Sequence, residues 1–163
     1  MPIANCGVNI TLTPVEVYFG ELIGKLRHKE SMDKGLKDSY GFSGDGEKIH
    51  ISGACGEIAA AKSCAVYWEP TVNTFKLRSD IGDVIQVRTR SNDTYDLIVR
   101  PDDNDGDVFI LVIDHSPVFN IKGWFPGYLS KQPELMQTYG GRPPAYFVPQ
   151  RILLPMGLLS LRR

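Results

Sequence analysis

The sequence is poor in cysteine, in net charge and in long apolar stretches. Its three cysteines (Cys6, Cys55 and Cys64) include no C-x-x-C pair, which disfavours a disulfide framework and a zinc ribbon. The formal net charge is −1, so any binding of nucleic acid must depend on a local basic patch. No apolar run approaches the roughly 18 residues of a membrane span, and we see no secretory signal. We therefore expect a cytoplasmic protein without a membrane partner.

The length and composition of the chain predict one globular domain. It has 163 residues, of which 42% are hydrophobic and 23% are charged, as is usual for a single domain with a buried core. The domain divides into an N-terminal arm, helix and glycine-rich loop (1–47), a core (48–124) and an extension rich in proline and glycine (125–163).

Local patterns predict helices first and strands after them. Residues 1–13 alternate weakly, as in a short strand or an extended arm. Thr13-Pro14-Val15-Glu16 is typical of a helix start, and this helix is expected to reach about Leu36. The other expected elements are a helix over Lys48–Val66, β-rich runs at Val72–Leu77, Val84–Arg90, Tyr95–Arg100, Val108–Asp114 and Val118–Trp124, a hairpin turn at Ser91–Thr94 and a short helix near Leu129–Tyr139. This order predicts a mixed α/β or α+β domain with a mostly antiparallel sheet.

Glu57 is the one carboxylate in the second predicted helix. Its neighbours one or two turns away are all small, namely Gly53, Ala60, Ala61 and Cys64. A stripe of small residues lets a helix lie close to a sheet, and a carboxylate there is unfavourable unless it is paired or bound to a metal. The alternative is that Glu57 lies exposed on the rim of the helix, where glutamate is usually found.

The strand predicted over Val84–Arg90 carries long polar side chains on one face. Alternation places Gln86, Arg88 and Arg90 together, shortly after Asp80 in the sequence. If the helix with Glu57 covers this face, carboxylates and cations converge there. If the face is solvated, the pattern is that of a half-exposed strand. A second acidic run, Asp102–Asp107, indicates a solvated turn.

The order of these residues resembles the PD-(D/E)XK, or restriction-endonuclease-like, nuclease superfamily. The shared features are Gly56-Glu57 on a helix, then Asp80, then a strand with the signature Gln86-x-Arg88. Roughly residues 53–155 also resemble uncharacterised phage and prophage proteins with a nuclease-like fold. The resemblance implies a restriction-endonuclease-like core, with a central mixed β-sheet flanked by helices, in a protein that acts in a host cell.

The resemblance also implies a site for Mg²⁺ or Mn²⁺, which would polarise the phosphate and lower the pKa of bound water. Asp80 is the implied central ligand, and Glu57 holds the metal directly or through water. Gln86 has the position of the second acidic ligand, and Arg88 that of the family lysine beside the attacking water or the phosphate. These four are the implied catalytic residues. The implied metal set is Glu57, Asp80, Gln86, the backbone carbonyl of Val87 and, as a competing ligand, Asp83.

The predicted function is metal-dependent hydrolysis of DNA phosphodiester bonds, by analogy on branched or broken DNA as in Holliday-junction resolvases. Because Gln86 is uncharged and arginine cannot serve as a general base, the alternative is a catalytically inactive nucleic-acid-binding or virion-associated module with the same fold. A third alternative is a structural protein that uses its proline-rich C-terminal part as a contact surface. The expected DNA contacts are Lys62, Arg88, Arg90, Lys131 and Arg142. A homodimer is implied by analogy, although no apolar heptad or stripe in the sequence identifies an interface.

Overall fold

The computed structural model describes residues 7–35, 45–72 and 79–160. Its helices are α1 (Pro14–Asp33), α2 (Gly46–Ser63) and the single turn α3 (Gly127–Ser130), with 3-10 turns at Pro133–Leu135, Gln150–Ile152 and Met156–Leu158. Its strands are β1 (Val8–Thr11), β2 (Ile85–Arg90), β3 (Leu97–Val99), β4 (Val108–His115), β5 (Val118–Pro126), β6 (Met136–Gln137) and β7 (Ala145–Val148). Within the described ranges, no helix is both long and apolar enough to cross a membrane.

The larger sheet is mixed, with the strand order β1-β5-β4-β2. β2 runs parallel to β4, whereas β5 pairs antiparallel with both β1 and β4. The sequence of β4 is almost continuously apolar because both of its faces are covered. Its side chains alternate between two hydrophobic clusters, Ile110 and Val112 with α2 and Phe109, Leu111 and Ile113 on the opposite side.

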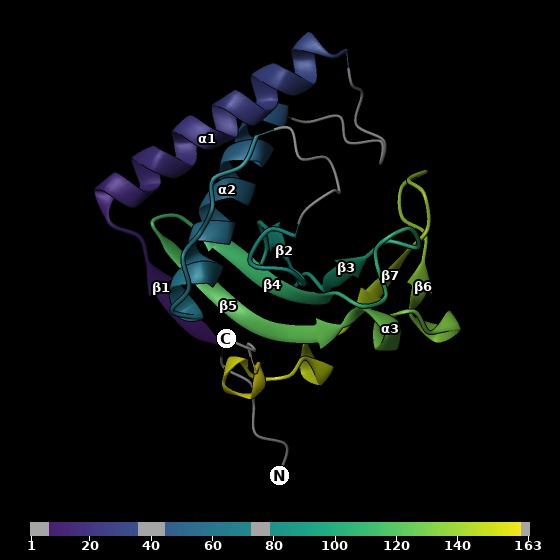
Figure 1. Cartoon of the computed structure of the whole chain (residues 1–163). Coiled ribbons are helices and arrows are strands. Elements are labelled where there is room, and N and C mark those ends of the chain that lie inside the picture. The colour runs from purple at the N-terminus through teal and green to yellow at the C-terminus, as the bar shows by residue number, and fades with distance from the viewer. Residues whose placement is uncertain (1–6, 36–44, 73–78, 161–163) are drawn as a thin grey trace.

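The molecule has three layers. α2 covers one face of the larger sheet, and α1 packs on the outside of α2 (Figure 1). A smaller sheet with the order β3-β7-β6 packs against the other face of the larger sheet. Leu97 and Val99 of β3 and Val148 of β7 are fully buried against the apolar side chains of β4. The prediction of a mixed α and β chain with a mixed sheet and flanking helices is therefore confirmed.

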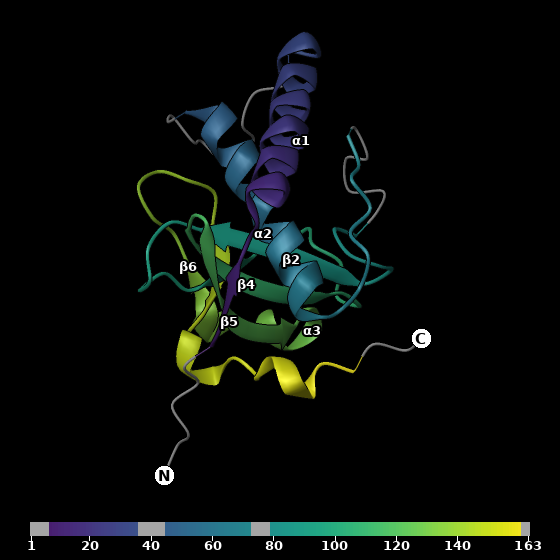
Figure 2. The ribbon, with the colours of Figure 1, turned by 90° about the vertical axis from the view of Figure 1, so that its left-hand side faces the viewer.

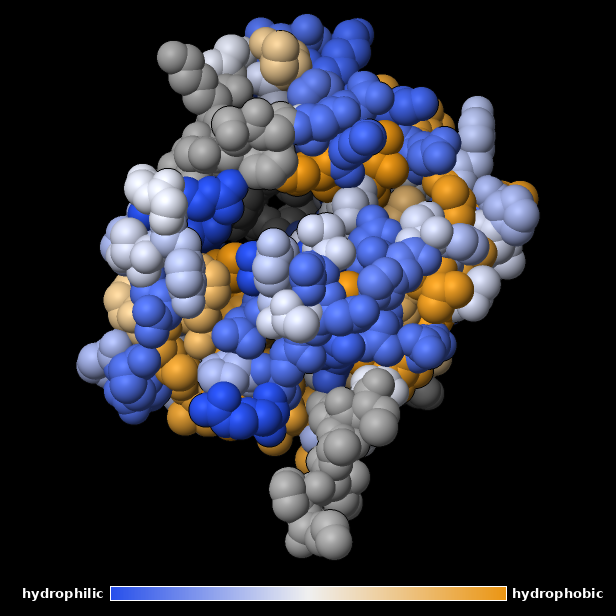
Figure 3. Space-filling view, turned by 180° about the vertical axis from the view of Figure 1, so that it is seen from behind, coloured by the Kyte–Doolittle hydropathy of each residue, from blue (hydrophilic) through white to orange (hydrophobic). Residues whose placement is uncertain are grey.

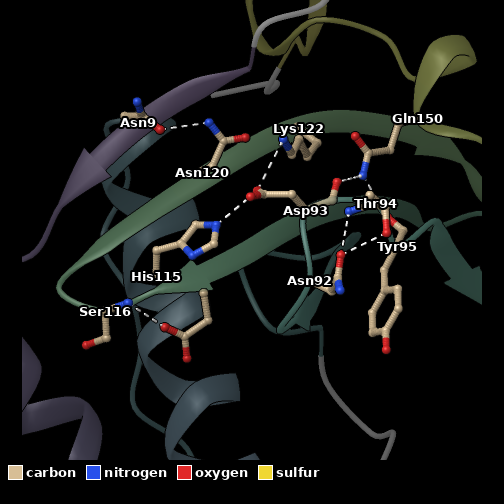
Figure 4. A network of polar contacts seen from close by, with 11 residues as sticks. Asn9, Asn92, Asp93, Thr94, Tyr95, His115, Ser116, Asn120, Lys122 and Gln150 are labelled. Atoms are coloured by element: carbon tan, nitrogen blue, oxygen red, sulfur yellow. Dashed lines mark hydrogen bonds and ion pairs between the residues drawn. The ribbon is translucent and has the colours of Figure 1, made fainter.

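The turn at Ser91–Thr94 forms, but the predicted hairpin is wrong, because β2 belongs to the larger sheet and β3 to the smaller one. Polar contacts with residues of later segments hold the turn in place (Figure 4). The carboxylate of Asp93 lies 2.9 Å from Nε2 of His115 and 3.6 Å from Nζ of Lys122. The side chain of Gln150 donates to the carbonyl of Asp93. These contacts fix the chain where it passes from one sheet to the other.

Both long helices begin and end at recognisable signals. At the start of α1, the Thr13 hydroxyl accepts from the N–H of Glu16, and the Glu16 carboxylate accepts from the N–H of Thr13, which is the capping box that the sequence predicts. α1 ends at Asp33, before the predicted Leu36, and Gly35 follows with φ +62°, a conformation that favours glycine at helix ends. α2 begins two residues before the predicted Lys48, with Asp45 as its N-cap.

Two glycines of α1 allow it to lie directly on α2. A Cβ atom at Gly20 would lie 2.4 Å from Sγ of Cys55, and one at Gly24 would lie 2.4 Å from Cα of Ile51. Distances this short leave no room for any side chain larger than hydrogen. The spacing of these two glycines therefore allows α1 and α2 to pack this closely.

The short helix predicted near Leu129–Tyr139 is wrong. The chain forms α3, then a 3-10 turn at Pro133–Leu135, then β6. Pro133 explains the break, because proline has no N–H for the helical hydrogen bond and its ring clashes with the preceding turn. Most of the strand predicted over Val72–Leu77, and most of the glycine-rich loop, lie outside the described residues.

Gly24→Ala and Gly53→Ala test the helix packing as a matched pair. A Cβ at Gly24 would collide with the backbone of Ile51, whereas one at Gly53, also in a helix, meets nothing within 4 Å. We expect Gly24→Ala to lower the free energy of unfolding by about 2 kcal/mol and Gly53→Ala to raise it by up to ~1 kcal/mol. Urea denaturation measures both, and effects of the same sign would contradict the close contact of α1 with α2.

Candidate functional site

Glu57 is buried, and its charge is matched by Arg27. The residue is 7% exposed. Nη1 and Nη2 of Arg27 donate to its two carboxylate oxygens at 2.8 and 3.0 Å, and Nε1 of Trp68 donates to Oε2 at 2.9 Å. Of the two alternatives for Glu57, the structure therefore shows the buried and paired one, in the bidentate geometry that makes arginine–carboxylate pairs strong.

Arg27 is absent from the predicted site. It lies on α1, on the same helical face as Gly20 and Gly24, which bring that face against α2. Its Nε donates to the carbonyl of Thr71 at 2.8 Å, so the guanidinium group bridges α1, α2 and the segment that follows Trp68. The sequence contains a signal for this face, because Gly20, Gly24 and Arg27 recur at helical spacing. A search for apolar residues alone does not detect it.

Asp80 lies beside the outer edge of β2, the edge turned away from β4. Its Oδ2 accepts from the backbone N–H of Val87 at 2.7 Å. Burial raises the pKa of Asp80 to about 7, and the negative charge of Glu57 adds to the rise, while the Val87 hydrogen bond and the charges of Arg88 and Arg27 oppose it. Asp80 and Glu57 therefore share one electrostatic environment, in which the Asp80 carboxyl holds its proton up to near-neutral pH.

The backbone carbonyl of Val87 points toward the same edge as Asp80. In a strand, the N–H and C=O of one residue point to the same side, and the N–H of Val87 is directed to Asp80. Ile85, two residues earlier, exchanges hydrogen bonds with Ile81 on this edge. The Asp80 carboxylate and the Val87 carbonyl thus place two oxygen atoms along one strand edge.

The side chains of Gln86 and Arg88 extend from the face of β2 that is turned away from α2. Ile85 and Val87 pack in the cluster that contains α2, and Thr89 lies against Gly56 of that helix. Alternation along the strand directs Gln86 and Arg88 the other way. Helix α2 therefore does not cover the polar face of β2, and the structure does not bring the Gln86 side chain together with Glu57.

The polar face of β2 is covered instead by the loop that precedes β4. Nε2 of Gln86 donates to Asp107 at 2.9 Å, and Nη2 of Arg88 donates to Asp103 at 2.8 Å. The guanidinium carbon of Arg88 also lies 5.0 Å from the centre of the Phe109 ring. The face is thus half-exposed and is not closed by α2, and Arg88 acts on Asp80 through its charge.

The acidic run over Asp102–Asp107 forms the exposed turn that its composition predicts, but two of its carboxylates, those of Asp103 and Asp107, are directed inward. Asp107 is 7% exposed, and the carboxylate of Asp103 also accepts from the N–H of Arg100 at 2.7 Å. Lys131 donates to the carbonyls of Pro101 and Asp103 and forms an ion pair with Asp105. Composition alone does not reveal these contacts, because the partners of the acidic side chains come from β2 and from the segment after β5.

The predicted DNA-contacting cations already have partners within the protein. Lys62 donates to the carbonyl of Thr11 and to Glu16. Lys131 holds the acidic loop, and Arg88 is bound to Asp103. The Arg90 guanidinium lies 4.2 Å above the Tyr95 ring and donates to the carbonyl of Asp96, while burial and the charges of Arg100 and Arg142 lower its pKa.

Among the side chains that the structure describes, no three of His, Cys, Asp and Glu gather as a metal site. Asp83 is exposed, and its carbonyl accepts from the Ser79 hydroxyl at 2.7 Å. The donors that fit a cation are the Asp80 carboxylate and the Val87 carbonyl, with the charge of Glu57 beside them. Oxygen donors suit Mg²⁺ or Mn²⁺, and a positive ion would offset the repulsion that helps raise the pKa of Asp80.

Replacement of Arg27 tests the pairing with Glu57. Arg27→Met leaves a buried carboxylate without its counter-charge, so we expect the free energy of unfolding to fall by about 3 kcal/mol. Adding Glu57→Gln removes the uncompensated charge and restores most of that loss. Urea unfolding of the wild type, both single variants and the double variant measures the coupling, with the exposed pair Glu30–Lys34 as a control worth under ~1 kcal/mol. Additive losses would contradict the pairing.

Asp80→Asn tests the raised pKa. The amide oxygen still accepts from the N–H of Val87 but cannot ionise. Because the pKa of folded Asp80 is about 7 against 3.8 for the unfolded group, the wild type loses stability relative to the variant as the pH rises between these values. We expect the variant to be more stable by on the order of 2 kcal/mol at about pH 8 and close to wild type near pH 4, in chelator. Melting temperatures across this range measure it, and a difference independent of pH would contradict the assignment.

The chain was also compared with known proteins. No protein-family model, no curated protein and no solved structure matches it. A function can therefore be inferred only from the residues of this chain and from the resemblance of its motif.

Proposed function

We propose that the protein is a divalent-metal-dependent nuclease with a restriction-endonuclease-like core, which hydrolyses phosphodiester bonds in DNA. The observation that carries the proposal is the pair of Glu57 and Asp80 in one low-dielectric environment, flanked by Arg27 and Arg88. A carboxyl group with a pKa of about 7 lowers stability whenever it is ionised at neutral pH. Such groups are concentrated at functional sites, where binding or catalysis offsets the loss.

Each residue of the site has a distinct part in this proposal. Asp80 and the carbonyl of Val87 would hold Mg²⁺ or Mn²⁺, which supplies a polarised phosphate and a bound water of lowered pKa. Glu57 provides a second negative charge beside them, and Arg27 limits how much of that charge acts on the cation. Arg88, held by Asp103, places a permanent positive charge near the phosphate but accepts no proton, because arginine stays protonated.

The C-terminal end of β2 at Arg90, beyond the part that the acidic loop covers, offers a path for the DNA backbone. Arg90, Arg100 and Arg142 lie close enough for their charges to act on one another, and phosphate groups would relieve that repulsion. Two exposed aromatic residues accompany them: Tyr95, 42% exposed, lies under Arg90, and Tyr139, 58% exposed, packs edge-on against Phe147. Exposed aromatic rings beside arginines suit stacking with the bases of single-stranded or distorted DNA.

One observation favours the second candidate, a catalytically inactive DNA-binding module with the same fold. Both oxygens of Glu57 are already bound by Arg27, so its charge is satisfied without a metal. The two candidates differ at Asp80, because only a metal-dependent nuclease requires the ionised carboxylate there. The experiment is therefore built on Asp80.

We expect wild-type protein with Mn²⁺ to cleave at least one of duplex, single-stranded and four-way-junction DNA. Asp80→Asn should lose at least ~100-fold in cleavage rate, since the amide cannot bring the negative charge that holds the cation. The matched control is Asp83→Asn, at an exposed position three residues away, which should stay within about twofold of wild type. Labelled DNA on denaturing gels measures the rates.

Melting temperatures provide the second arm of the experiment. Mn²⁺ should raise the melting temperature of the wild type and of Asp83→Asn but not that of Asp80→Asn, because a ligand stabilises only a folded state that binds it. Cleavage that survives in Asp80→Asn would rule out this site. No cleavage and no metal effect, with DNA still bound in a gel shift, would replace the nuclease by the inactive binding module.

A further inference from the structure

Two of the three histidines of the chain lie together between α1 and α2. His28 of α1 and His50 of α2 have ring centres 5.5 Å apart, with an angle of 51° between the ring planes. Both residues are half-buried. Because they belong to different helices, their spacing in the sequence does not reveal the pair, and neither of them belongs to the site around Asp80.

The ring of His28 packs against the first turn of α2. A Cβ atom at Gly46 would lie 3.1 Å from Cε1 and 3.3 Å from Nδ1 of His28, so this edge of the imidazole faces α2. Gly46 and His50 are one helical turn apart on the same face of α2. Within the described ranges, neither imidazole has a hydrogen-bond partner. Ring nitrogens of both histidines are therefore available to a ligand.

The separation of the two rings suits a metal ion that binds both of them. Zn²⁺ binds histidine nitrogen at about 2.0–2.1 Å in a tetrahedral arrangement, which places the centres of two bound imidazoles about 5 Å apart. The observed 5.5 Å is close to this value, and small rotations of the side chains close the difference. The helices therefore hold the two histidines at the separation that such an ion requires.

The charges around the pair allow a cation to bind. Arg27, which precedes His28 on α1, donates to both carboxylate oxygens of Glu57, so its charge is largely matched. Burial lowers the pKa of His50, and the charges of His28 and Arg27 add to the decrease. The imidazole of His50 is therefore neutral at neutral pH, and the neutral form is the one that binds a metal.

Water supplies the remaining ligands of an ion bound here. Among the described side chains, no third His, Cys, Asp or Glu gathers with the pair. Glu47, one turn before His50, is exposed and has the spacing at which glutamate and histidine share metals in helical bundles. Seen from behind, the surface at this end of the molecule is mainly hydrophilic (Figure 3), so solvent reaches the pair.

The pair lies where the two helices have least support from the sheets. The C-terminal part of α1 and the first turns of α2 extend together beyond the sheet layers (Figure 2). There the helices contact each other, as in the close approach of Gly24 to Ile51 and the ion pair of Arg27 with Glu57. A link between the helices at this end therefore acts on the part of α1 that carries Arg27.

We propose that His28 and His50 bind Zn²⁺, which links the C-terminal half of α1 to the first turns of α2. Imidazole nitrogen suits Zn²⁺, whereas Mg²⁺ and Mn²⁺ prefer oxygen donors, so this site differs in kind from the oxygen atoms at Asp80. The proposal does not depend on the proposed nuclease activity. Zn²⁺ bound here holds α1 on α2 and so stabilises Arg27 in its place beside Glu57.

Melting temperatures with Zn²⁺ and with a chelator test the proposal. We expect about 100 µM Zn²⁺ to raise the melting temperature of the full-length protein by several degrees, because the ion binds the folded state. His28→Gln and His50→Gln should each lose most of this rise. The matched control is His115→Gln, at the third histidine, which is exposed beside Asp93 and should keep it. Melting in chelator verifies that all three variants fold.

Proton NMR of the imidazole C–H signals locates the ion. Zn²⁺ should shift the signals of His28 and His50 but not those of His115, and the shifts should vanish near about pH 5, where protonated imidazole releases a metal. Asp80→Asn should keep both Zn²⁺ effects, so failure of this site and failure of the nuclease are separate results. A wild type that Zn²⁺ does not stabilise, or a rise in melting temperature that either His28→Gln or His50→Gln keeps, would overturn the proposal.

Discussion

The pairing of Arg27 with Glu57 is the interaction on which the site depends. A carboxylate in the middle of an apolar, alanine-rich helix is tolerable only if a cation reaches it without water. The glycines of α1 make that reach short, because they let α1 lie on α2. Trp68 closes the other side of the carboxylate with its indole N–H. Helix packing and site electrostatics are therefore one constraint, since a side chain larger than hydrogen at Gly24 would move the helix that carries Arg27.

A second constraint separates the two faces of β2. Toward α2 the strand presents Ile85 and Val87, which belong to the core. Toward the smaller sheet it presents Gln86 and Arg88, which need polar partners there. The acidic loop supplies them through Asp107 and Asp103, so a turn that is mostly exposed also provides the partners of two half-buried polar side chains. On this face β2 is thus held by one hydrogen bond and one ion pair, while its opposite face is stabilised by apolar burial.

The sequence was informative wherever one segment carries its own signal. The residues from Thr13 to Glu16 predicted a helix start and the β-rich run at Val108–Asp114 predicted a strand, both of which form. The small neighbours of Glu57 raised the possibility of a buried, paired carboxylate, which is the alternative that the structure shows. Long-range pairing left no such signal. The partner of Glu57 lies 30 residues earlier in the chain, the ladder between β2 and β4 is parallel across an acidic loop, and Pro133 ended a helix that composition favoured. The apolar residues of α1 also did not show which face of the helix is buried, because Leu22 and Ile23 are adjacent in sequence but only Ile23 is buried.

Arg27 has the place of an internal counter-ion, and this explains how the fold tolerates two neighbouring carboxylates without a metal. Its charge lowers the repulsion that Asp80 feels from Glu57, yet the pKa of Asp80 still lies near 7, so compensation is incomplete. A divalent cation at Asp80 would supply the missing positive charge and would at the same time compete electrostatically with Arg27 for Glu57. The affinity of the site for metal should therefore depend on how firmly α1 holds Arg27 in place.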